Sequence, residues 1–162
     1  MQKDIRDALN LQVNREYFAM YLYLAMASHF EAENLTGFAK WFALQSAEER
    51  GHAEKILRYL LERGERVELE EIAKPPMSWD SPRDAVAAAL EHEKKVTGWI
   101  NEIVDLAIKH NDHATNIFLH WFVEEQVEEE SSVEAILDRL EMMGDFKGGL
   151  FLMDRELATR EA

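Results

Sequence analysis

Four glutamates interrupt the apolar stripes of four separate helical segments, and they constrain the fold of this chain more than any other feature. They are Glu16, Glu49, Glu93 and Glu129. A carboxylate that faces a hydrophobic core is costly unless another group compensates it. Because four segments share this anomaly, we expect the four side chains to meet at one buried site. His52 lies three residues after Glu49, which places an imidazole on the same helical face.

Hydrophobic residues repeat at helical spacing in four long segments and one short one. The predicted helices cover about residues 3–33, 36–63, 82–110, 114–143 and 150–157. Thr36 is expected to cap the second helix, Gly64 to end it, and Ser81-Pro82 to begin the third. Only 7 Gly and 3 Pro occur among 162 residues, which also favours long helices. We therefore predict an all-α four-helix bundle with a short C-terminal fifth helix, in a single domain over residues 1–162.

The connection over residues 65–81 has no helical periodicity, and Pro75-Pro76 excludes a helix there. It is long for a connection in a compact domain. Extended at ~3.3 Å per residue, it could cross the full length of a bundle. We predict one long crossover connection of this kind, which is a known bundle type. A loose hairpin loop is the alternative.

The positions of the glutamates along their helices support a common site. Glu16 and Glu49 lie about 18 and 14 residues from the turn between their helices, and Glu93 and Glu129 each lie about 18 residues from the next turn. At about 1.5 Å per residue, each pair therefore meets at a similar height in an antiparallel hairpin. Buried salt bridges are the alternative, but these stripes offer few cations.

The composition limits the partners and the ligand types. Without cysteine, a metal must be held by oxygen and imidazole ligands. A formal charge of −14 argues against binding nucleic acid or anionic lipid.

No segment is long and apolar enough to span a membrane, and the start has no signal-peptide pattern, so we expect a cytoplasmic protein. The segment 17–27 is apolar nearly all round, which predicts contact with another subunit.

Paired carboxylates and an imidazole suit a centre with two metal ions. Carboxylates are hard oxygen ligands that can bridge cations, and imidazole suits iron, zinc and copper. Glu49-Arg50-Gly51-His52 is a Glu-x-x-His motif, in which one helix supplies both ligand types. The fourth helix has Gln126-Val127-Glu128-Glu129, with glutamine and glutamate in place of the glutamate and histidine of such a motif. We predict a two-iron site.

Four stretches carry a resemblance to a known family: LQVNREYFAMYLYLAMA, SAEERGHAEK, EHEKKVT and FLHWFVEEQVEEE. With these, the chain resembles bacterial and archaeal non-haem ferritins over essentially its whole length. The resemblance implies a ferritin-like fold and an iron-storage protein with ferroxidase activity. Such a protein oxidises Fe(II) with O₂ or H₂O₂ and deposits Fe(III) oxyhydroxide mineral inside a homo-oligomeric shell of 24 subunits.

The resemblance also implies roles for individual residues. The first iron would be held by Glu16, Glu49 and His52, with Glu49 as the bridge; the second by Glu93 and Glu129, with Gln126 beside it; and a third, adjoining iron by Glu48, Glu125, Glu128 and Glu129. Tyr23 matches a tyrosine near the catalytic centre, and Trp121 a nearby aromatic residue. A packing role for Tyr23, and a solvated helix face for Glu125 and Glu128, are open alternatives.

Departures from related families narrow the resemblance. Arg50 follows Glu49 where a haem-binding relative would carry methionine, so no haem is expected. The lack of cysteine and the short last helix argue against a rubrerythrin with its cysteine-rich domain and against DNA-protecting mini-ferritins. A stand-alone di-iron peroxidase of the rubrerythrin type and a non-catalytic helical binding or scaffold protein are the alternatives. The histidines expected at the surface or behind the ligands are His29, His92, His110, His113 and His120.

Overall fold

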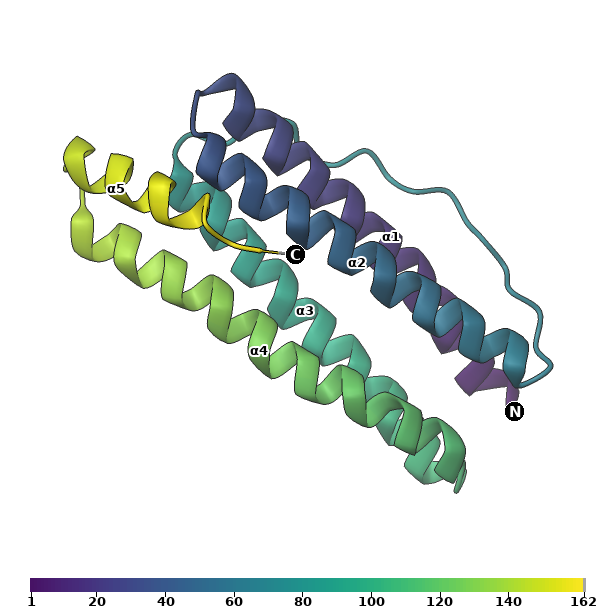
Figure 1. Cartoon of the computed structure of the whole chain (residues 1–162). Coiled ribbons are helices and arrows are strands. Elements are labelled where there is room, and N and C mark those ends of the chain that lie inside the picture. Colours follow the sequence, from purple (N-terminus) through teal and green to yellow (C-terminus); the bar gives the residue numbers. More distant parts are fainter. Residues whose placement is uncertain (162) are drawn as a thin grey trace.

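The computed structural model describes residues 1–161, which form five helices and no strand. The helices are α1 (Lys3–Ala32), α2 (Thr36–Glu62), α3 (Pro82–Lys109), α4 (His113–Met143) and α5 (Lys147–Leu157). Helices α1 and α2 pack as one antiparallel hairpin, and α3 and α4 as a second (Figure 1). Helix α1 also packs on α3, and α5 closes one end of the bundle against α2 and α4. The predicted all-α bundle with a short fifth helix is confirmed.

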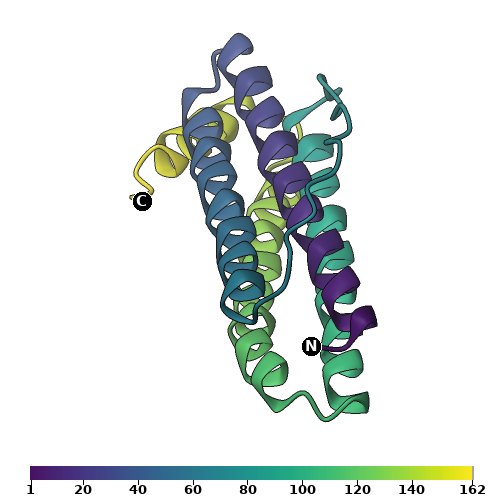
Figure 2. The same ribbon diagram turned by 90° about the vertical axis from the view of Figure 1, so that its right-hand side faces the viewer.

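The connection between the two hairpins is the predicted crossover. Residues 63–81 run without regular structure along the α1–α2 hairpin and return to the end of the bundle where α2 begins (Figures 1 and 2). Asn10 of α1 pairs with this segment through both ends of its amide, because it accepts from the Glu68 N–H at 2.8 Å and donates to the Arg66 carbonyl at 3.3 Å. The alternative of a loose hairpin loop is therefore wrong.

The helix ends predicted at Gly64 and Ser81 are observed, but the cap predicted at Thr36 is not. Ser81 accepts a hydrogen bond from the Asp84 N–H at 3.1 Å, and Pro82 occupies the first turn of α3, as the sequence predicts. Gly64 lies just past α2 with φ of +73°, a conformation that glycine adopts without strain. Thr36, however, is the first residue of α2 rather than its cap.

The free amides at the start of α2 are satisfied from a distant helix. One carboxylate oxygen of Asp154, in α5, accepts from the Gly37 and Phe38 N–H groups at 2.8 and 3.0 Å. A Cβ at Gly37 would lie 1.7 Å from the Asp154 carbonyl oxygen, so only glycine allows α5 to approach this closely. The cap of α2 therefore depends on the docking of α5.

Two apolar clusters form the core, one toward each end of the bundle. The cluster near α5 includes Tyr23, Phe30 and Phe42, and the opposite cluster includes Leu9, Ile56, Leu60, Ile100 and Phe122. Each large side chain buried in this way contributes about 1.5–3 kcal/mol of transfer free energy. The apolar periodicity of the sequence also predicts inward positions for Met20, Val104, Phe118 and Met143, but these four residues are only half-buried. Among the described residues, no helix is long and apolar enough to cross a membrane.

Candidate metal centre

The four glutamates and His52 converge between the two apolar clusters, one glutamate from each long helix. Their side chains are almost completely buried: the exposed fraction of the residue is 1% for Glu16, 2% for Glu49, 1% for Glu93, 6% for Glu129 and 5% for His52. The matching positions expected from the sequence are thus realised in three dimensions. Burial excludes water as a general partner, so each oxygen needs a donor or a cation.

Helices α1 and α2 provide one group of three possible ligands. His52 Nδ1 lies 3.4 Å from Glu49 Oε2 and 4.0 Å from Glu16 Oε2. All three residues can present a ligand atom within 4.8 Å of the others. Glu16 Oε2 and Glu49 Oε1 are buried without any hydrogen-bond partner. Two unsatisfied carboxylate oxygens beside an imidazole nitrogen are a donor set that fits a divalent cation.

Helices α3 and α4 provide carboxylates that are held by hydrogen bonds. Glu93 accepts from the Tyr23 hydroxyl through Oε1 and from Gln126 Nε2 through Oε2 at 3.2 Å. Glu129 Oε2 accepts from Gln45 Nε2 at 2.6 Å. These bonds fix the orientation of each carboxylate while leaving oxygen lone pairs for a metal.

Burial and mutual repulsion raise the pKa values of the glutamates. Burial is the main cause for Glu16, whose pKa is well above its usual value, and the charge of Glu49 adds to it. Burial, followed by the charge of Glu93, likewise raises the pKa of Glu49 well above its usual value and that of Glu129 to about 7. Burial also raises the pKa of Glu93, although the hydrogen bonds from Tyr23 and Gln126 oppose this.

No Lys or Arg within residues 1–161 forms an ion pair with any of the four glutamates; within the same residues, the only basic side chain within 4.0 Å of any of them is His52. The alternative of buried salt bridges therefore does not describe this site. A bound divalent cation would favour the charged carboxylates and displace their protons. The donor set therefore fits a cation taken up from solution.

Two glutamines next to the ligand set were not singled out as functional from the sequence. Gln12 Nε2 donates to Glu16 Oε1 at 2.7 Å, and Gln45 donates to Glu129 as described above. Both are fully buried. Their spacing in the sequence could have identified them. Gln12 lies four residues before Glu16, and Gln45 four residues before Glu49, which places each glutamine on the same helical face as the glutamate.

The residues predicted to hold a third iron are only partly gathered. His52, Glu125 and Glu129 form a second group whose ligand atoms lie within 4.8 Å, with His52 Nε2 at 4.0 Å from Glu125 Oε1. Glu48 lies outside both groups and is bound by Arg160 at 2.7 Å. Glu128 is exposed.

Aromatic side chains surround the centre. The Trp121 ring packs edge-on against His52 at a centroid distance of 5.4 Å. Tyr23 is fully buried, and burial followed by the charge of Glu93 raises its pKa well above the usual value, so its hydroxyl keeps its proton. His92 is buried beside Tyr23 and Trp99 rather than at the surface, and burial lowers its pKa to about 4.

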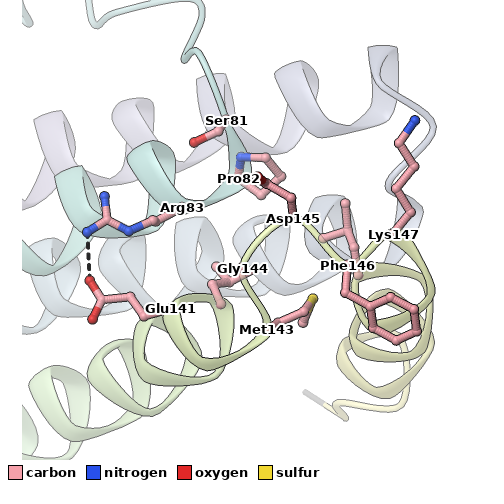
Figure 3. A pocket seen from close by; sticks show the side chains of 11 residues that line it. Ser81, Pro82, Arg83, Glu141, Met143, Gly144, Asp145, Phe146 and Lys147 are labelled. Carbon is pink, nitrogen blue, oxygen red and sulfur yellow. Dashed lines mark hydrogen bonds and ion pairs between the residues drawn. The ribbon is translucent and has the colours of Figure 1, made fainter.

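A separate cavity of about 760 Å³ lies at the end of the bundle, between the start of α3, the end of α4 and α5 (Figure 3). Its walls are largely apolar, and its clearest polar feature is the ion pair between Arg83 and Glu141 at 2.7 Å. None of the gathered metal ligands lines it. The chemistry of the chain is therefore concentrated in the middle of the bundle.

Known proteins resemble this chain in both fold and sequence. The family model described as "Ferritin-like domain" matches residues 6–143. "Bacterial non-heme ferritin" of Staphylococcus haemolyticus is 40% identical over 160 residues, covering 99% of this chain and 96% of the relative. The corresponding protein of Staphylococcus aureus (strain MRSA252) is 38% identical with the same coverage. An "open pore ferritin" from Archaeoglobus fulgidus superposes with a TM-score of 0.98 at 43% identity, covering 99% of both chains.

The four-helix bundle with its long crossover and its buried glutamates defines a ferritin-like bundle protein with a carboxylate-rich candidate metal site. The matches above place it within that class. The chain belongs to the ferritin family, on its non-haem side, as the sequence resemblance predicted. Iron storage is the function of this family that the donor set supports.

Proposed function

We propose that this chain oxidises Fe(II) at the buried carboxylate centre and stores the product as Fe(III) mineral inside a shell of 24 subunits. The observation that carries the proposal is the pair of buried oxygens without hydrogen-bond partners, Glu16 Oε2 and Glu49 Oε1, on two residues that gather with His52. An anionic buried site whose ligands form no ion pair with Lys or Arg binds metal ions strongly and favours the more highly charged product. Two Fe(II) ions held side by side would each give one electron to O₂ or H₂O₂.

The residues of the chain have distinct proposed tasks. Glu16, Glu49 and His52 would bind the first iron, with Glu49 as the bridge, and Glu93 and Glu129 would bind the second. Tyr23 and Gln126 hold Glu93 in place by donating to its two oxygens. Because the carboxylate pKa values are raised, metal binding near neutral pH would release protons into solution.

Assembly into a shell is supported by the apolar surface of α1. Tyr21 and Leu24 are 44% and 50% exposed on the segment that the sequence predicts to contact another subunit. Exposed apolar side chains grouped on one helix are typical of a subunit interface. Several details stay predictions: the number of subunits, the presence of two iron ions with a third beside them, the absence of haem and the cytoplasmic location.

Replacing Glu49 with glutamine tests the proposed activity. The change keeps the size of the side chain but removes the bridging charge, and we expect fast Fe(II) oxidation to fall by about 10–100-fold or more. Stopped-flow absorbance measures the rate, and a sizing column confirms assembly. Glu54→Gln, at an exposed position of the same helix, is the matched control. Oxidation as fast in assembled Glu49→Gln protein as in the control would refute the assignment.

Iron loading followed by sizing separates storage from the peroxidase alternative. A storage protein retains many ferric ions per shell after loading and remains a large particle. A small oligomer that consumes H₂O₂ with an external electron donor and retains no mineral would instead be a rubrerythrin-type peroxidase.

A further inference from the structure

Arg160, beyond α5, reaches back over α2 and contacts three of its side chains. The chain end after α5 turns toward the middle of the bundle (Figure 1). The guanidinium donates to Glu48 Oε2 at 2.7 Å and to Gln45 Oε1 at 2.5 Å. Its central carbon also lies 4.9 Å from the Trp41 ring centroid. A second tail contact, from Lys40 Nζ to the Ala158 carbonyl at 2.8 Å, holds the same segment on α2.

The contact with Gln45 continues to the metal centre. The Gln45 amide accepts from Arg160 through its oxygen and donates to Glu129 Oε2 through its nitrogen at 2.6 Å. An amide rotated by half a turn would point its NH₂ at the guanidinium and its oxygen at a carboxylate, and both contacts would be lost. Arg160 therefore fixes the one orientation of Gln45 that supports Glu129.

The contact with Glu48 sets a charge beside the same centre. The negative charge of Glu48 is among the causes that raise the pKa values of Glu49 and Glu129, after burial and the charge of Glu93, so it acts on both proposed ligands. In this structure the carboxylate of Glu48 is already matched by a cation of the chain itself.

We propose that Arg160 is a built-in counter-ion of the metal centre, which positions Glu129 through Gln45 and competes with an incoming metal cation for Glu48. The proposal rests on the proposed metal-binding function. An additional cation at Glu48 must displace the guanidinium, which frees the tail from α2. Occupation of this outer position is thereby coupled to release of the residues after α5.

A Tb(III) titration of the metal-free protein tests this coupling, with emission sensitised by tryptophans such as Trp41. We expect Arg160→Met to tighten the weakest Tb(III) site about tenfold or more, because one positive charge within a few Å is removed from a partly solvated site. Arg160→Lys should show a much smaller change, because it keeps the charge while losing the two-pronged geometry. In a Glu48→Gln background the gain from Arg160→Met should disappear.

Arg139→Met is the matched control, because Arg139 also ties α5 to the bundle through an exposed pair with Glu156 at 2.5 Å. It should leave the titration unchanged. Equal Tb(III) curves for wild type and Arg160→Met would overturn the proposal. Equal changes in Arg160→Met and in the control Arg139→Met would overturn it as well. Wild-type protein that binds no Tb(III), and no Zn(II) by calorimetry, would instead refute the metal-binding function itself.

Discussion

Replacing Glu129 with glutamine should stabilise the metal-free protein at about pH 8 and change it little at about pH 5. Burial and the charge of Glu93 raise the pKa of Glu129 from 4.5 to about 7 in the folded protein. The folded state therefore holds a proton that the unfolded state loses first. The resulting penalty is absent below pH 4.5, grows up to about pH 7 and is complete above it.

The size of the effect follows from the same two values. The difference between 4.5 and about 7 corresponds to about 3 kcal/mol of unfolding free energy at about pH 8. Glutamine keeps the shape and an acceptor oxygen for Gln45, so this penalty is removed without opening a cavity. For a domain of this size, about 3 kcal/mol raises the unfolding temperature by roughly 6–12 °C.

Calorimetry of EDTA-treated protein at a fixed guanidinium concentration would measure the difference at both pH values. Glu134→Gln, at an exposed position of α4, is the control and should change neither melt. Added Zn(II) should stabilise the wild type more than Glu129→Gln, because the wild type offers the ion one more negatively charged carboxylate. A gap between wild type and Glu129→Gln that is the same at both pH values would refute the electrostatic reasoning.

Three further substitutions test the scaffold around the centre. Asp154→Ala should cost about 1 kcal/mol and speed amide exchange in the peptide that contains Gly37, as seen by mass spectrometry, because α2 loses its cap. Arg63→Met removes a two-pronged pair with Asp112 at 3.0 Å and should cost about 1–2 kcal/mol near neutral pH in denaturant melts. Since hydrogen bonding from Arg63 lowers the pKa of Asp112 from 3.8 to about 2, this cost should shrink as pH falls through that window, and a constant cost would contradict it. Leu60→Ala, at a fully buried position, should lower the unfolding free energy by about 2–5 kcal/mol, with a lower guanidinium midpoint and an unchanged slope.

Much of the fold was predictable because it follows from local sequence signals. Apolar periodicity and the Ser81-Pro82 start located the long helices to within about one residue of their observed ends. The Thr36 cap failed because the real cap, Asp154, comes from a helix more than a hundred residues away. Helix α5 begins at Lys147 rather than Leu150, so Gly148 and Gly149 lie within the helix. A Cβ at either glycine would clash with the side chain of Phe146 or Met143, so the two glycines allow these side chains to pack against the helix.

In the candidate site too, some residues could be predicted from local sequence and others could not. Glu16 and Glu49 were identifiable because a charged residue within an apolar helical pattern stands out in the sequence, and both residues are buried in the structure. Arg160 gave no such signal, because it lies outside every helical stripe and reaches the centre only through the return of the chain end. The pairing of Glu48 with Arg160 therefore depended on tertiary structure.

The crossover of residues 63–81 has a consequence for the order of folding. Each hairpin is built from contacts that are close in sequence, and contacts of this kind form early. Each hairpin also carries half of the centre, with Glu16 and Glu49 on one and Glu93 and Glu129 on the other. Docking of the hairpins therefore brings like charges together late in folding, at a rate set by closure of the crossover loop. A metal ion present at that step would relieve the repulsion, so we expect added metal ions to speed the docking of the two hairpins.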